Sequence, residues 1–85
     1  MTKQTDIQTK VRNILESKGG CLPLGEIYDE FWKCYVVSDP RKEWYAEYTK
    51  WNEPRYRHHI RRALESLQKR GIANNPQRGI WALKP

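Results

Sequence analysis

Residues 54–83 read PRYRHHIRRALESLQKRGIANNPQRGIWAL, and they contain the clearest pattern in the chain. Apolar residues recur at helical spacing until Gly71, so we predict a helix over residues 54–70. Residues 72–74 and 80–83 are predicted to form a β-hairpin around a turn at residues 75–79. Trp81 and Leu83 fall on one face of the return strand, which we expect to close over the helices. The apolar face of the predicted helix comprises Tyr56, Ile60, Ala63, Leu64 and Leu67.

Positive charge is concentrated in the same part of the chain. Residues 1–53 carry eight Lys/Arg and nine Asp/Glu, whereas residues 54–85 carry eight Lys/Arg and a single acid, Glu65. The formal net charge of +6 therefore comes from the C-terminal part. Such an asymmetry is typical of a protein that binds a polyanion.

Three helices are predicted upstream, at about residues 5–18, 24–35 and 40–51, from their apolar periodicity. The predicted apolar stripe of the second comprises Leu24, Ile27, Tyr28, Phe31 and Tyr35. Residues 22–23, between the first two, are a weak candidate for a short strand that pairs with the hairpin. For the third helix, Asp39 has the position of an N-cap and Pro40 that of the first helical residue. Its aromatic residues Trp44, Tyr48 and Trp51 recur at four and three, which predicts a core-facing stripe.

The length and composition restrict the classes of protein to be considered. A chain of 85 residues is expected to form one domain, residues 1–85, with little room for a catalytic apparatus. The sequence has no long apolar run and no apolar signal core at its start, so we expect no membrane partner and a cytoplasmic, nucleoid-associated protein. Cys21 and Cys34 are expected to be reduced thiols.

These elements together predict a fold that is mainly α with a small β-hairpin, namely a winged helix–turn–helix. In this fold, the helix over residues 54–70 would enter a DNA groove and the hairpin would form the wing beside it. No grouping of Ser, His and acidic residues, no phosphate loop and no metal-ligand spacing is evident, so we expect neither enzymatic activity nor a cofactor or metal.

The predicted DNA contacts are basic or polar residues of the helix and the wing. Arginine can bond both acceptors of a guanine edge, and Lys/Arg side chains neutralise phosphates. Arg61, Arg62 and His58 are expected at base edges, and the other residues at the backbone or the minor groove. A solvated surface without a ligand is the alternative for such a face. The complete set is Arg55, Arg57, His58, Arg61, Arg62, Lys69, Gln77 and Arg78.

Two aromatic residues in the 40–51 segment are candidates for stacking on a flipped or modified base, Trp44 and Tyr45. Core packing is the competing interpretation for Trp44, which belongs to the aromatic stripe, whereas Tyr45 lies off it. His58 and His59 are adjacent on a helix and point about 100° apart, so they are not expected to chelate one ion together. His59 is expected to flank the core instead.

The C-terminal stretch resembles the N-terminal winged-helix domain of Mrr-type restriction endonucleases, and it is similar to winged-helix readers attached to methyladenine-dependent endonucleases. The resemblance extends loosely to Leu24–Ile27. It implies binding to double-stranded DNA, with modified DNA as a candidate ligand and a fused or associated nuclease domain as a partner. The matching segments are Pro54-Arg55-Tyr56, Ile60–Ala63, Leu67–Gly71, Pro76–Gly79 and Ile80–Leu83.

The sequence therefore predicts a DNA-binding module, the reader part of a restriction or phage-defence protein. A protein–protein adaptor is the alternative, because winged helices also serve in assemblies and a fold alone does not define a function. In an adaptor, Trp32 or Tyr45 would be the anchoring aromatic residue.

Overall fold

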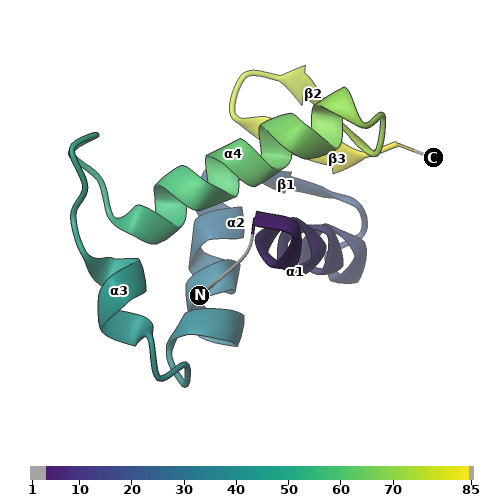
Figure 1. Ribbon diagram of the computed structural model, residues 1–85. Coiled ribbons are helices and arrows are strands. Elements are labelled where there is room, and N and C mark those ends of the chain that lie inside the picture. The colour runs from purple at the N-terminus through teal and green to yellow at the C-terminus, as the bar shows by residue number, and fades with distance from the viewer. Residues whose placement is uncertain (1–3, 85) are drawn as a thin grey trace.

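The computed structural model describes residues 4–84, with side chains from residue 6 onward, and is mainly helical with one small sheet (Figure 1). No helix in this part of the chain has the length and apolar character needed to cross a membrane. In chain order, the elements are α1 (Gln4–Ser17), β1 (Cys21–Pro23), α2 (Leu24–Phe31), the π-helical turn η1 (Trp32–Val36), α3 (Lys42–Ala46), α4 (Arg55–Lys69), β2 (Ala73–Gln77) and β3 (Ile80–Leu83).

The three strands form an antiparallel sheet in the order β1-β3-β2. Leu22 of β1 pairs with Trp81 of β3, so the weak strand signal at residues 22–23 corresponds to a real strand. The predicted turn was too long, because β2 continues to Gln77 and only Arg78 and Gly79 connect the strands. Gly79 has a φ of 80°, a left-handed conformation that glycine adopts without a Cβ penalty.

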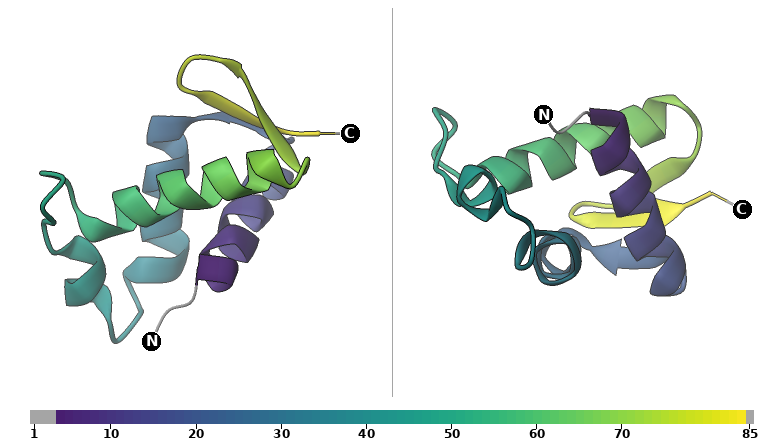
Figure 2. Two further views of the ribbon diagram at one scale, coloured as in Figure 1. Left: turned by 45° about the horizontal axis from the view of Figure 1, so that its top comes forward. Right: turned by 60° about the horizontal axis from the view of Figure 1, so that its bottom comes forward.

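The hydrophobic core lies between α1, α2 and α4, and the sheet closes one end of it (Figure 2). All five apolar residues predicted for the α4 face are buried, which confirms that face. They meet a stripe from α1 that includes Val11 and Leu15. Full burial of one such aliphatic side chain contributes about 1.5–3 kcal/mol relative to its exposure. Trp81 and Leu83 are half-buried and pack on this core, as expected from the return strand.

The second helix differs from a regular α-helix at its C-terminal end. In the predicted stripe, the core residue that follows Phe31 is Tyr35. In the structure, the fully buried residue that follows Phe31 is Val36. The π-helical turn explains the shift: the amide of Val37 donates to the carbonyl of Trp32, five residues back, at 3.0 Å. A π-turn inserts one residue into the helical repeat, so the next core position moves by one.

The third helix is much shorter than predicted. α3 covers only Lys42–Ala46, with Arg41 at its N-cap position. The Asp39 carboxylate accepts the amide of Arg41 at 2.7 Å in the turn that precedes this helix. After Ala46, Glu47 is extended, and Tyr48 forms an isolated bridge with Pro54. Residues 47–54 are therefore a loop, which projects beyond the N-terminal end of α4 (Figure 1).

The aromatic stripe predicted for this segment is also wrong. Tyr48 and Trp51 lie in the loop and are 68% and 48% exposed. Tyr45, which lay off the stripe, is fully buried and makes an edge-on contact with Phe31 at 6.2 Å between ring centroids. In a helix of five residues, one side chain suffices to anchor the element, and here that residue is Tyr45.

Candidate nucleic-acid interface

α4 is amphipathic: one face packs in the core and the opposite, outer face is polar. At about 100° per residue, His58, Arg62, Glu65 and Lys69 project away from Ile60 and Leu64. Arg62 and Lys69 are exposed, and His58 is half-buried. Glu65 is the only acid between them, and within the described residues it forms no ion pair with Lys69. This face therefore offers cations to a ligand.

Two of the predicted arginines are already paired with carboxylates. Nη2 of Arg61 bonds to Oε2 of Glu53, whose side chain is mostly buried. Nη1 of Arg55 lies 3.6 Å from Oε2 of Glu47 and donates a hydrogen bond to the Trp44 carbonyl. The structure thus brings these arginines to the expected region of α4, but their charges are partly neutralised there.

Arg57 lies on the flank of α4 that faces α2. Its Nε donates to the Tyr56 hydroxyl at 3.3 Å, and its guanidinium lies 5.2 Å from the ring centroid of Tyr28. The hydroxyl of Tyr56 holds the pKa of Arg57 above its usual value. Arg57 remains exposed and makes no ion pair among the described residues, so its charge is available beside the outer face.

The β2–β3 hairpin, which the sequence predicts as a wing, places one further cation near α4. Arg78 stands in the two-residue turn, and Gln77 is exposed at the end of β2. A groove of about 500 Å³ separates the wing from α4, lined among others by Glu65, Gln68 and Arg78. Because Glu65 and Arg78 line one groove, the turn of the wing and the outer face of α4 border the same space.

The two histidines of α4 are held by tryptophans. His58 stacks on Trp51 with 3.6 Å between ring centroids and 9° between planes, and His59 stacks on Trp44 at 5.4 Å and 19°. Burial lowers the pKa of both histidines, and nearby positive charges, including Arg61 beside His58 and Arg55 beside His59, lower it further. Both pKa shifts favour the neutral form of the imidazole.

A hollow of about 390 Å³ opens between these two stacks. It is lined by Trp51, Arg55, His58, His59 and Arg62. The sequence interpretation missed this site, because it assigned Trp51 to the core and His59 to its margin. The only signal in the sequence was the pair His58-His59 between arginines, since the position of Trp51 depends on a loop that had been predicted as helix.

The two aromatic residues predicted to stack on a base have different surroundings. Tyr45 is fully buried, so it cannot offer a face to a base, and this assignment is wrong. Trp44 is half-buried between the imidazole of His59 and the guanidinium of Arg55, 4.7 Å from its ring centroid. Trp51 and Tyr48 are the exposed aromatic residues of this region instead.

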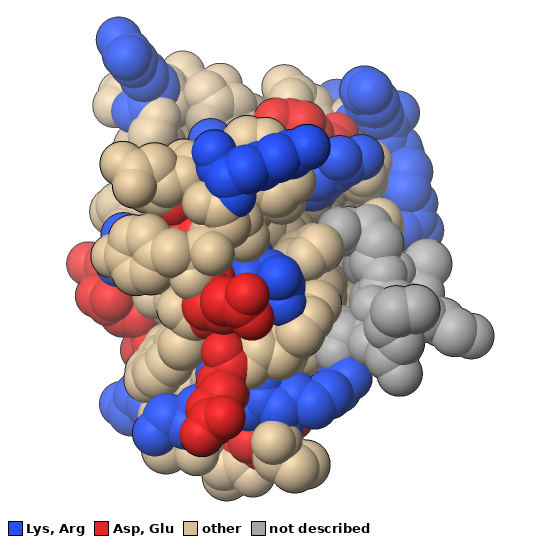
Figure 3. Space-filling view, turned by 60° about the vertical axis from the view of Figure 1, so that its left-hand side comes forward, with Lys and Arg blue, Asp and Glu red and all other residues tan. Residues whose placement is uncertain are grey.

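The charge pattern at this end of the molecule is mixed. Figure 3 shows Lys/Arg side chains at the top and right of this face and in a band across its lower part, with acidic side chains between them in the middle and at the left. Glu47 and Glu53, which pair with Arg55 and Arg61, belong to the loop beside α4. The basic face predicted for α4 therefore has fewer unpaired cations than the count of arginines in the sequence indicates.

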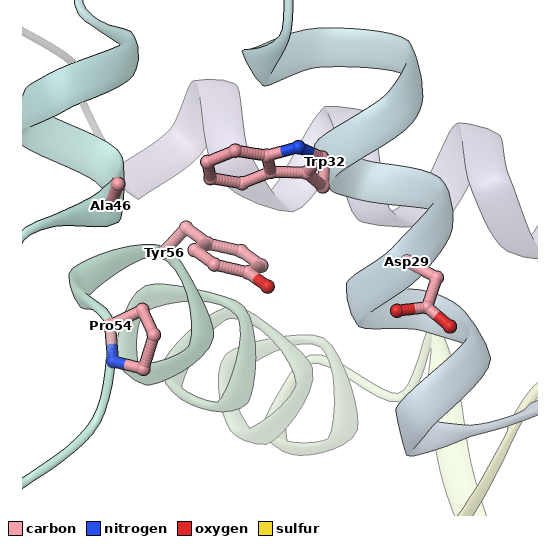
Figure 4. A pocket seen from close by; sticks show the side chains of 5 residues that line it. All are labelled: Asp29, Trp32, Ala46, Pro54 and Tyr56. Atoms are coloured by element: carbon pink, nitrogen blue, oxygen red, sulfur yellow. The ribbon is translucent and has the colours of Figure 1, made fainter.

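A second hollow of about 410 Å³ lies between α2, η1 and the start of α4 (Figure 4). The rings of Trp32 and Tyr56 lie side by side in it, 5.1 Å apart between centroids, and Asp29 stands at its edge. It is separate from the outer face of α4, because Tyr56 belongs to the core-facing side of that helix. Ala46 and Pro54 complete its lining.

Comparison with protein-family models, with curated proteins and with solved structures finds no match to the chain.

Proposed function

We propose that the protein is a winged helix–turn–helix module that binds double-stranded DNA. The order of α1, β1, α2, α3, α4, β2 and β3, with β3 central in the sheet, is compatible with that fold. In this arrangement, α4 is the recognition helix and the β2–β3 turn is the wing.

The observation that carries the proposal is a set of unpaired cations on the outer face of α4 and in the β2–β3 turn beside it. Arg62 and Lys69 on α4 and Arg78 in the wing make no ion pair among the described residues. All three are exposed. Unpaired cations near one another are unfavourable in isolation, and a phosphate backbone that lies across them would stabilise all three.

Different residues would have different tasks in the complex. Arg62 projects from the middle of α4 and is suited to a guanine edge in the major groove. Lys69, Arg57 and Arg78 would neutralise phosphates, and Gln77 would lie beside the minor groove. Arg55 and Arg61 would contribute only after their bonds to Glu47 and Glu53 open.

The resemblance to Mrr-type winged helices extends the proposal to a biological setting. The chain would act as the reader of a restriction or phage-defence system, and a fused or associated nuclease domain would supply cleavage. A preference for modified DNA follows from the same resemblance.

Fluorescence anisotropy with a labelled random duplex tests the proposal. We expect binding by the parent protein and a loss of about 2–6 kcal/mol in the double variant Arg62→Ala/Arg78→Ala, if each arginine contributes about 1–3 kcal/mol. Arg12→Ala, an exposed arginine of α1, is the matched control and should bind as the parent does. Equal binding by the double variant would exclude α4 and the wing as the interface.

The hollow at Trp32 favours an adaptor as the second candidate function. Trp32 and Tyr56 would receive a side chain of a partner protein, and aromatic residues in such pockets are frequent hot spots. Tyr45 is buried and cannot be the anchor. An adaptor would show a partner-dependent loss of affinity in Trp32→Ala and no dependence on Arg62 or Arg78.

A further inference from the structure

The hollow between the aromatic stacks of α4 has the chemistry of an oxyanion site. Two guanidiniums, those of Arg55 and Arg62, and two imidazoles, those of His58 and His59, line it, and Trp51 forms a further wall. None of these lining residues carries a carboxylate. A volume of about 390 Å³ falls within the range of small-molecule sites.

The side chains around the hollow are held in place before any ligand binds. The stacks with Trp51 and Trp44 fix the planes of His58 and His59. Arg55 lies over the Trp44 ring and donates to the Trp44 carbonyl at 3.5 Å. Rigid donors lose little conformational freedom when a ligand binds, so the site is preorganised.

Several donors in the hollow have no partner in the described part of the chain. Neither imidazole makes a hydrogen bond there, although both rings are half-buried, and Arg62 makes no ion pair there. Arg55 forms an ion pair with Glu47, with 3.6 Å between Nη1 and Oε2. This ion pair is weak, because the carboxylate of Glu47 is exposed to solvent. The side-chain nitrogens of His58, His59 and Arg62 are reachable from solvent, because none of them is among the buried side-chain atoms that lack a partner, so the phosphate of a ligand in the hollow could accept hydrogen bonds from them.

We propose that this hollow binds the terminal phosphomonoester of a nucleotide, with the attached base against Trp51. A monoester carries about −1.5 to −2 at pH 7, more than the single charge of an internal phosphodiester. His58 covers one face of the Trp51 ring, and the Nζ of Lys50 lies over the ring, 5.1 Å from its centroid. A base would replace Lys50 over the ring, and bases stack on aromatic rings without regard to sequence. The ligand is thus a 5′-phosphorylated DNA end or a free mononucleotide.

This inference rests on the proposed DNA binding, but it assigns a different ligand to a different part of α4. The duplex interface extends toward Lys69 and the wing, whereas the hollow lies at the N-terminal half of the helix beside the 47–54 loop. Arg62 borders both sites. A test must therefore use a residue that lines the hollow alone, and His59 meets this condition.

The experiment compares two duplexes of one sequence, internally labelled, with either phosphate or hydroxyl at their 5′ ends. By anisotropy, we expect the phosphorylated duplex to bind about tenfold more tightly, the effect of one added charge-assisted contact. A 5′-mononucleotide should compete for the added affinity, and inorganic phosphate should compete less because it lacks a base.

The variant His59→Phe keeps a ring to stack on Trp44 but removes the N–H donors. We expect it to bind the hydroxyl duplex as the parent does and to lose the preference for phosphate. Arg12→Ala, on the other helix, should keep the preference. If His59→Phe fails to fold, as judged by circular dichroism, the comparison of the two duplexes on the parent protein still tests the site.

The outcomes separate the two proposals. Equal affinity for both duplexes would overturn the terminal-phosphate site and leave the proposed function intact. A preference that persists in folded His59→Phe would also overturn this assignment. Binding of the mononucleotide without binding of either duplex would support the hollow and overturn the proposed duplex interface.

Discussion

Arg61 and Arg62 are neighbours on α4, but their surroundings give them different roles. Arg61 is bonded to Glu53 from the preceding loop, whereas Arg62 makes no ion pair within the described residues. The sequence predicted both as base-reading residues, because periodicity shows which face a residue occupies and not which loop carboxylate reaches it. The partner became evident only when residues 47–54 proved to be a loop.

Glu53→Gln tests this difference at the level of a single residue. Loss of the carboxylate charge should release Arg61 toward the duplex, so we expect stronger DNA binding and a salt dependence steeper by about 0.9 in log K against log[salt]. Anisotropy titrations at several salt concentrations would measure both quantities.

Glu16→Gln is the matched control, because Glu16 pairs with Arg12 on α1 at 3.2 Å, away from the groove. It changes the net charge equally and should leave the slope of the salt dependence unchanged. A slope that stays at the parent value in Glu53→Gln would show that Arg61 does not reach the DNA once it is free.

The elements were predictable where the hydrophobic pattern was long and regular. Residues 55–69 of α4 and the return strand follow their predicted bounds closely, since five core residues repeat over four turns of α4. The pattern failed for α3 and for η1. A five-residue helix has too few residues to show a period, and a π-turn shifts the period by one residue, so Val36 took the core position predicted for Tyr35.

Tyr45 should therefore anchor α3. Tyr45→Ala removes a fully buried ring from the core, and we expect it to lower the free energy of unfolding by about 3–5 kcal/mol. Tyr48→Ala, three residues away and 68% exposed, should change it by less than about 0.5 kcal/mol. Urea denaturation of both variants would measure this, and similar midpoints would contradict the assignment.

The two histidines of α4 make the free energy of unfolding depend on pH, and the direction of their pKa shifts determines the sign of this dependence. Folding lowers the pKa of His58 and His59 below the ordinary value of 6.5, mainly through burial. Between the folded and unfolded pKa values, the unfolded chain binds more protons, so stability rises with pH there. We expect the histidines to make their full contribution to the free energy of unfolding above pH 6.5. The free energy of unfolding should fall as the solution is acidified through the folded pKa values.

Urea titrations at pH 7.5 and 5.5 would measure the loss. The variant His59→Phe should show a smaller difference between the two pH values, because it keeps the ring but cannot gain a proton. The carboxyl groups of Glu30 and Asp39 do not contribute to the difference in stability between pH 7.5 and 5.5. Their pKa values are lowered in the folded protein, so they affect its stability only at more acidic pH. Stability that rises on acidification from 7.5 to 5.5 would contradict the assigned shifts.

At the scale of the whole molecule, the protein offers fewer unpaired positive charges to a ligand than its composition indicates. Residues 54–85 carry a formal charge of +7, but loop carboxylates neutralise part of it in the N-terminal half of α4. Within the described residues, Arg62 and Lys69 on the outer face of α4 and Arg78 in the β2–β3 turn remain without an ion pair. Charge counts predict that a polyanion binds, whereas only the tertiary arrangement shows where it can lie.

The salt dependence of duplex binding tests this account most directly. With Arg57, Lys69 and Arg78 as the phosphate-neutralising set, log K should fall with log[salt] with a slope of about −3, and the triple alanine variant of these residues should flatten it toward zero. Binding that does not change with salt, or a triple variant with the slope of the parent, would contradict the claim that these cations form the interface.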